Sequence, residues 1–307
     1  MKINRVFFFI GIAVFWAAGI YYGQRYYVQF QKDKQERILY EARKGSWRDL
    51  RQSVTSEISG FNGYPGIVIK DMDTGWEFSY EKAQIFPSAS LAKIPLMAAC
   101  FIAADQGRIK LGRNIALKPG DKLTGSGMLK DMPAGSTFSV ERLIGLMIYD
   151  SDNTATNILT DLAGIDYVNK AFKNFGLKNT NLSRKIADYK SRDNGIENYT
   201  TAEDMALLLE KIYRKELGNK NVSDKCISML KLNRINDRIP KYLPAEIIVA
   251  HKTGLEREVC HDAGIVFTRT GDFIIVVLTK HANPDSSASK QFIAKISSIV
   301  YKYFEQL

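Results

Sequence analysis

The sequence is poor in the residues that bind metals and form disulfides, with three cysteines and three histidines among 307 residues. No cysteine stands in a Cys-x-x-Cys motif and no histidine in a His-Glu-x-x-His motif, so neither a redox centre nor a zinc site is indicated. We expect no metal and no cofactor. Cys100, Cys226 and Cys260 are either buried thiols or one disulfide with one thiol left over.

Other absences narrow the class of protein further. No Gly-x-Ser-x-Gly motif is present, which disfavours a Ser–His–Asp triad. No basic motif interleaved with aromatic residues is present either, so a nucleic-acid partner is not expected. The net charge of +10 is concentrated in residues 1–52, which carry ten Lys or Arg against four Asp or Glu. This basic excess favours anionic lipid or wall polymer as its neighbour.

One long apolar run stands near the N-terminus. It comprises 17 apolar or small residues, Val6 to Tyr22, flanked by basic residues. We predict that residues 1–23 form an uncleaved, single-pass anchor in the cell membrane, with the rest of the chain on the extracytoplasmic (periplasmic) side. The alternative is a signal peptide cleaved after Ala17 or Ala18, which would give a secreted or periplasmic protein.

The rest of the chain is predicted to form a charged, helix-prone linker (24–45) and one domain (46–307). In that domain, strand patterns stand at both ends and helical patterns lie between them. This order predicts an α+β fold, in which a five-stranded antiparallel sheet has flanking terminal helices on one face and an all-helical lobe on the other. The expected strands are 66–70, 76–80, 246–252, 263–268 and 273–279, and the expected terminal helices are 47–58 and 289–306.

Three short motifs point to the chemistry. The sequence contains four Ser-x-x-Lys matches, but only Ser90-Leu-Ala-Lys93 is followed at suitable distances by two further motifs. These are Ser151-Asp-Asn and Lys252-Thr-Gly, which begin 61 and 162 residues after Ser90. A serine hydroxyl needs a neighbouring base to become a nucleophile, and Ser90 and Lys93 share one face of a helix. Burial and the charge of Lys252 would lower the pKa of Lys93 and make it that base.

With these motifs the chain resembles the class A β-lactamases and the wider penicillin-recognising serine hydrolases, from about Glu57 to the C-terminus. The resemblance implies that Ser90 is acylated, that Lys93 is the general base or relays a proton to it, and that Ser151 protonates the leaving nitrogen. Lys252 would face the substrate carboxylate. The resemblance also implies substrate-binding roles for Asn153, Thr253, Gly254 and Leu255, and the N–H groups of Ser90 and Leu255 would form the oxyanion hole.

Two departures from that family bear on turnover and substrate. The Glu-x-x-Leu-Asn pattern that supplies the deacylating base in class A β-lactamases is absent. Asp188 is our first choice for that catalytic role, and Glu197 is the second. Many relatives also carry an arginine on the strand after the Lys-Thr-Gly motif, where this chain has His261 and its neighbours. Arg257 or His261 would then have to bind the substrate carboxylate.

The sequence thus predicts a serine hydrolase that opens β-lactams through an acyl-Ser90 intermediate and hydrolyses the ester. The alternatives are a D,D-carboxypeptidase or endopeptidase acting on peptidoglycan stem peptides, and a penicillin-binding sensor domain without turnover. The expected partners are therefore a small-molecule β-lactam or a stem peptide, with the membrane contacted through the N-terminal segment. We expect a monomer.

Overall fold

The computed structural model describes residues 3–281 and 285–306, apart from the side chains of residues 3–9, 11–14, 17 and 18. By its internal contacts the chain divides into two units at residue 52. Helix α1 (Ile3–Ser59) belongs to the first unit up to Gln52 and to the second unit from Ser53 onward. The second unit, residues 53–306, holds the catalytic motifs.

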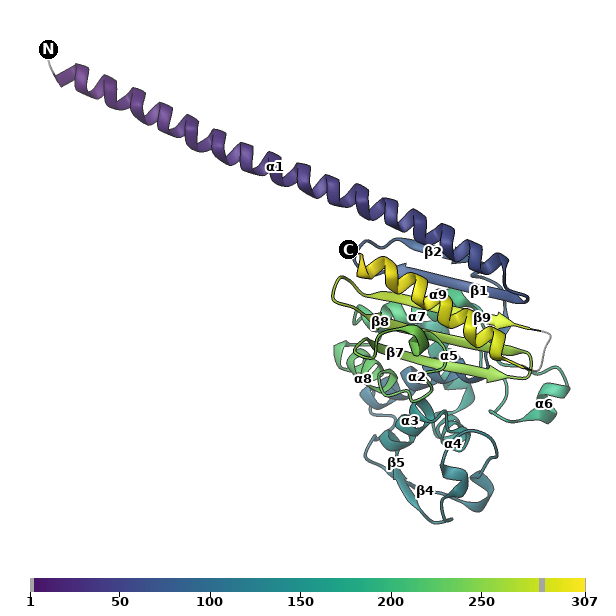
Figure 1. The fold of residues 1–307 in the computed structure, drawn as a ribbon. Helices are drawn as coiled ribbons and strands as arrows, with labels where there is room; N and C mark the ends of the chain where they lie inside the picture. The colour runs from purple at the N-terminus through teal and green to yellow at the C-terminus, as the bar shows by residue number, and fades with distance from the viewer. Residues whose placement is uncertain (1–2, 282–284, 307) are drawn as a thin grey trace. The chain divides into compact units, whose positions relative to one another are not determined.

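A five-stranded antiparallel sheet is the centre of the second unit, with strand order β2-β1-β9-β8-β7 (Figure 1). Two inner strands, β9 and β8, are buried along nearly their whole length because both of their faces are covered. The fold predicted from the sequence is confirmed. The strands are β1 (Tyr64–Asp71), β2 (Glu77–Tyr80), β7 (Ile248–Glu256), β8 (Val259–Phe267) and β9 (Phe273–Lys280).

Strands β7 and β8 are longer than their sequence indicates. The expected strand ended at Lys252, but β7 continues to Glu256 and pairs with β8 up to the turn at Arg257 and Glu258. The glycine and polar residues after Lys252 weaken the strand pattern, whereas the full ladder of hydrogen bonds to β8 stabilises the extension. The Lys-Thr-Gly motif therefore lies inside a strand and not at its end.

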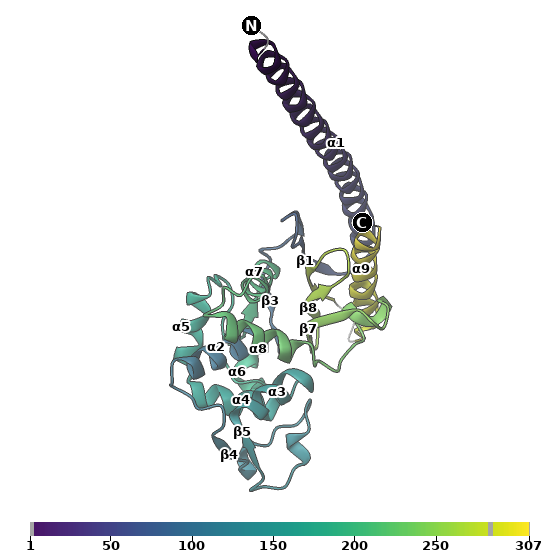
Figure 2. The same ribbon diagram turned by 90° about the vertical axis from the view of Figure 1, so that its left-hand side faces the viewer.

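Helices cover both faces of this sheet (Figure 2). On one face lies α9 (Ser287–Glu305). It contacts the end of α1 and the residues that follow it, through a stack of Phe61 on Phe292 and an ion pair of Lys295 with Glu57 at 3.1 Å. On the other face lies the helical lobe. Its helices are α2 (Lys93–Asp105), α3 (Val140–Tyr149), α4 (Asn153–Ala163), α5 (Ile165–Asn174), α6 (Tyr189–Asp193), α7 (Ala202–Tyr213) and α8 (Lys220–Leu230).

Helix α2 is the buried centre of the lobe. It is apolar on all sides, as expected for a helix surrounded by others, and it is preceded by a short 3₁₀ turn, η1 (Ala89–Ala92). Two small two-stranded sheets complete the lobe, namely β3 (Phe86–Pro87) with β6 (Tyr199–Thr200) and β4 (Asn114–Ala116) with β5 (Thr137–Ser139). Cys100, Cys226 and Cys260 are buried free thiols, and burial raises the pKa of Cys100 to about 12.

The structure adds no support for the predicted membrane anchor. Among the residues that it describes, no helix combines the length and the apolar character needed to cross a bilayer. Most side chains of residues 6–22, the apolar run within the predicted anchor 1–23, lie outside the described ones. The anchor therefore stays a prediction.

Candidate active site

Ser90 lies in η1, directly before α2, where strand β7 passes close by. A Cβ added at Gly254 would lie 3.4 Å from the Ala89 Cβ, so the strand and the turn are in van der Waals contact at this point. As a result, Ser90 and Leu255 line the same cavity. Unpaired N–H groups at the start of a helix and on the edge strand of a sheet are suited to stabilise an oxyanion.

Lys93 is fully buried one turn after Ser90. Its ammonium group donates to the Ser151 carbonyl at 2.6 Å, to the Ser151 hydroxyl at 3.1 Å and to Asn153 Oδ1 at 3.0 Å. Burial lowers the pKa of Lys93 well below 10.5, the charge of Lys252 lowers it further, and Asp152 opposes this with a smaller effect. A lysine in this environment can accept a proton at neutral pH.

Ser151 connects the other catalytic candidates. Its hydroxyl donates to Ser90 Oγ at 2.9 Å and accepts from Lys252 Nζ at 3.1 Å. Its backbone has φ of +54°, a left-handed conformation that is costly for a residue with a side chain and is often found at functional sites. The Ser151 hydroxyl therefore links the Ser90 hydroxyl to the ammonium groups of both lysines.

Lys252 is also fully buried and donates to the Thr253 carbonyl at 2.9 Å. Burial lowers its pKa to about 7, an effect that Asp262 opposes and Arg238 reinforces. The sequence did not single out Arg238, whose side chain is 2% exposed and donates to Cys260 Sγ at 3.1 Å. Its contribution depends on proximity in space, which no sequence motif signals.

The second motif is a helix cap as well as a part of the site. Asp152 caps α4 by accepting from the Ala155 N–H at 2.9 Å, and it also accepts from the Leu129 N–H at 2.9 Å. These two bonds fix the turn that carries Ser151 and Asn153. Asp152 thus holds Ser151 and Asn153 in place through its hydrogen bonds as a helix cap.

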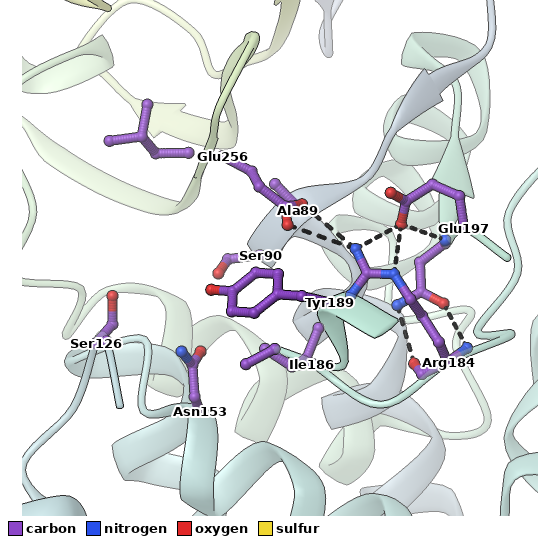
Figure 3. Close-up of a pocket in the computed structure, with 13 residues that line it drawn as sticks. Ala89, Ser90, Ser126, Asn153, Arg184, Ile186, Tyr189, Glu197 and Glu256 are labelled. Carbon is purple, nitrogen blue, oxygen red and sulfur yellow. Dashed lines mark hydrogen bonds and ion pairs between the residues drawn. The ribbon is translucent and has the colours of Figure 1, made fainter. Parts of the chain in front are cut away.

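A cavity of about 150 Å³ adjoins this buried network at Ser90 (Figure 3). Lys93, Ser151 and Lys252 lie behind its wall and do not line it. Ser90, Asn153 and Leu255 line it, together with residues from the loop 183–198. Asn157, one turn along α4, holds that loop by donating to the Ile186 carbonyl at 3.0 Å and accepting from the Ile186 N–H at 2.9 Å. The remaining lining residues are Ala89, Gly125, Ser126, Arg184, Ile186, Ala187, Tyr189, Glu197, Asn198 and Glu256.

Neither of the two candidates for the deacylating base is free. Asp188 is not among the lining residues, and its carboxylate caps α6 by accepting from the Ser191 N–H at 3.0 Å and the Ser191 hydroxyl at 2.6 Å. These bonds lower the pKa of Asp188. Glu197 lines the cavity, but it accepts from Arg184 Nε at 2.9 Å and from the Asn198 N–H at 2.7 Å. The base role that the sequence predicted for Asp188 is therefore not supported by any contact of Asp188 with the cavity.

A second carboxylate in the cavity wall was missed by the sequence analysis. Glu256 accepts from Arg192 Nη1 at 2.8 Å and lies 3.5 Å from Arg184 Nη2. Figure 3 shows the Arg184 guanidinium between the carboxylates of Glu197 and Glu256. The cavity therefore has a wall of paired charges that joins the loop 183–198 to β7.

The two candidates for binding the substrate carboxylate, His261 and Arg257, differ in burial. His261 is fully buried, with Nε2 at 2.9 Å from the Pro87 carbonyl, while Nδ1 accepts from the Thr279 N–H at 3.1 Å. Burial lowers the pKa of His261 to about 4, so the ring is neutral at neutral pH. A buried, neutral imidazole offers no positive charge to a substrate carboxylate, so these observations favour Arg257 over His261 for that role. Arg257 is exposed in the β7–β8 turn and lines a neighbouring cavity.

Comparison with known proteins agrees with the resemblance that the three motifs indicated. Residues 49–304 match the family described as "Beta-lactamase enzyme family". Among curated proteins, the β-lactamase VEB-1 of Pseudomonas aeruginosa is 27% identical over 235 residues, which is 71% of this chain and 78% of that protein.

Two solved structures are similar in both sequence and fold. A β-lactamase from Sphaerobacter thermophilus has 31% identity and a TM-score of 0.77, over 85% of this chain and 98% of the other. A variant of PBP-A, solved as an acyl-enzyme complex with penicillin G, has 30% identity and a TM-score of 0.77, over 85% and 97% of the two chains.

Proposed function

Because the chain belongs to the β-lactamase enzyme family, we propose that it is a serine hydrolase that opens β-lactam amides by acylation of Ser90 and then hydrolyses the ester. One observation carries the proposal. The Ser90 and Ser151 hydroxyls lie 2.9 Å apart, and Ser151 accepts hydrogen bonds from two buried lysines whose pKa values are lowered. This network supplies a base, a proton relay and a positive charge beside one nucleophile.

In the first half of the reaction, neutral Lys93 takes the Ser90 proton through the Ser151 hydroxyl as Ser90 Oγ attacks the carbonyl carbon. The N–H groups of Ser90 and Leu255 stabilise the oxyanion. Ser151 then passes a proton to the lactam nitrogen as the carbon–nitrogen bond breaks. The substrate is held at its acyl side chain by Asn153 and at its carboxylate by Lys252 and Thr253.

The second half, hydrolysis of the acyl-Ser90 ester, needs a base that activates water. Both carboxylates in the cavity wall, Glu197 and Glu256, are paired with arginines, and Asp188 is bound to Ser191. We therefore propose that acylation is fast and deacylation is slow. The same observation favours, as second candidate, a D,D-peptidase acting on peptidoglycan stem peptides or a penicillin-binding sensor, in keeping with the 30% identity to a PBP-A variant captured as an acyl-enzyme.

The place of action belongs to the proposal as well. The apolar run at residues 6–22 and the basic flank support an extracytoplasmic protein anchored by its N-terminal segment. This location gives direct access to β-lactams and to stem peptides. The proposal takes the protein as a monomer.

Labelling with a fluorescent penicillin tests the function. The full-length protein should be labelled at Ser90, Ser90→Ala should abolish labelling, and Lys93→Ala should slow it by at least about a hundredfold. The matched controls are Ser228→Ala and Lys231→Ala, which alter a Ser-x-x-Lys match without partner motifs. Labelling of Ser90→Ala at another residue would refute the site. Turnover of a chromogenic cephalosporin, compared with release of D-alanine from a D-Ala-D-Ala peptide, separates the two candidate functions.

A further inference from the structure

A second cavity adjoins the first. It measures about 210 Å³, and its lining shares Glu197 and Glu256 with the cavity that contains Ser90. The two carboxylates thus stand between the two cavities. The other lining residues of the second cavity are Pro87, Arg192, Arg257, Glu258, Val259 and Lys280.

The lining of the second cavity carries three basic and three acidic residues, and one of the basic residues, Arg257, has no ion-pair partner among the described residues. Glu197 is paired with Arg184, and Glu256 with Arg192. Lys280 and Glu258 lie 3.8 Å apart with both side chains more than half exposed, so their charges largely offset each other in solvent. The exposed Arg257 forms no hydrogen bond or ion pair within the described parts of the chain. The guanidinium of Arg257 could therefore form an ion pair with a carboxylate of a bound ligand.

Strand β7 sets the direction in which a substrate extends. It is the last strand of the sheet, and such an edge can pair with an extended peptide. In the proposed reaction the substrate carboxylate faces Lys252 and Thr253, and the carbonyl under attack faces Leu255. The acyl side therefore continues toward Glu256 and Arg257. Arg257 directly follows the last residue of β7 and stands two positions after Leu255, a span of about 7 Å at about 3.3 Å per residue.

From this geometry we propose that the second cavity is a subsite for an extended acyl-peptide, and that Arg257 binds a carboxylate carried about two residues before the penultimate D-alanine. The proposal rests on the acylation site at Ser90 proposed above. It also names the substrate class, because a compact β-lactam would fill only the first cavity whereas an anionic peptide would fill both. The paired state of Glu197 and Glu256 keeps them from repelling such a ligand.

Calorimetric binding to the full-length Ser90→Ala protein tests this without any turnover. The probes are two acetylated tetrapeptides ending in D-Ala-D-Ala, one with glutamate and one with glutamine as first residue. We expect the glutamate peptide to bind about fivefold more tightly at low salt, the scale of one exposed charge-assisted contact. Arg257→Ala should remove the difference. Arg269→Ala should preserve it, because Arg269 is an exposed arginine in the β8–β9 turn.

Equal affinities of the two peptides for the Arg257-containing protein would overturn the subsite, as would a preference that survives Arg257→Ala or a failure of both peptides to bind. The acylation proposal fails by a different result, namely loss of penicillin labelling in the protein that retains Ser90. The two failures are therefore distinguishable.

Discussion

The ammonium nitrogens of Lys93 and Lys252 lie at the same distance, 3.1 Å, from one oxygen atom, the Ser151 hydroxyl. Two buried positive charges around one acceptor repel each other, and burial adds to the cost of each. The pair therefore titrates as a unit, with a proton lost more readily than from a free lysine. This arrangement allows one lysine, Lys93, to be the neutral base of the reaction. The other, Lys252, then carries the positive charge that faces the substrate carboxylate.

The rate of acylation should depend on pH as a bell-shaped curve. On the acid side, protonation of Lys93 removes the base. On the alkaline side, Lys252, whose pKa is about 7, loses the charge that faces the substrate carboxylate, so the rate falls above neutral pH. The second-order rate constant for acylation by a chromogenic cephalosporin, measured by stopped flow from about pH 5 to about pH 10, checks this. A rate that keeps rising through alkaline pH would contradict it.

Replacing the buried Lys252 should stabilise the protein while it inactivates it. The pKa of Lys252 is about 7 in the folded state and 10.5 in its ordinary state, so the unfolded chain binds more protons between those values and stability rises with pH across that window. Lys252→Met should raise the melting temperature at pH 7 by a few degrees, with the difference vanishing near pH 10. The control is Lys110→Met, at an exposed lysine. A lower melting temperature for Lys252→Met at pH 7 would exclude this account.

Asp188→Asn should leave both steps of the reaction nearly unchanged. Asparagine caps a helix as well as aspartate, so α6 keeps its first turn, and the carboxylate of Asp188 is already bound to Ser191. We expect acylation and deacylation rates within about threefold of the unaltered protein, measured by pre-steady-state mass spectrometry. Accumulation of acyl-enzyme in Asp188→Asn would instead make Asp188 the deacylating base.

A carboxylate introduced at Ile186 should accelerate deacylation. Ile186 lines the cavity that contains Ser90, and Asn157 fixes its backbone there. Ile186→Glu adds a carboxylate to the lining of the cavity that contains Ser90, and we expect deacylation about tenfold faster or more. Ile186→Gln is the control of matched shape without the charge. Equal deacylation rates in the two variants would show that position 186 cannot direct a water.

Asn157→Leu should weaken both the fold and the reaction. The substitution leaves the N–H and carbonyl of Ile186 without their partner, at a cost of about 1–3 kcal/mol in the free energy of unfolding. Asn169→Leu is the control, because Asn169 holds the backbone of Leu182 by the same two bonds, outside the cavity. Denaturant unfolding should show similar losses, and acylation should slow only in Asn157→Leu. Slowing of acylation in both would assign the effect to general instability.

The sequence by itself determined the order and spacing of the Ser90, Ser151 and Lys252 motifs and the α+β fold with its five-stranded sheet. Both are local in origin. Apolar periodicity reports which segments are strands and helices, and a motif reports the chemistry of residues adjacent in the chain. The end of β7 was misjudged because a glycine-containing polar stretch carries little strand signal of its own, and its pairing with β8 supplies the missing part.

Only the tertiary structure decided which charges are free in the site. Glu256 pairs with Arg192 across 64 residues and approaches Arg184 across 72, and the Asp188 carboxylate is taken up by a helix cap. Burial also lowers the pKa of Lys252 and of His261, which no motif indicated, whereas the lowered pKa of Lys93 was expected from the sequence. Such contacts depend on how distant elements pack, and desolvation depends on what surrounds a group in three dimensions. Neither the contacts between distant elements nor the degree of desolvation can be obtained from local sequence patterns.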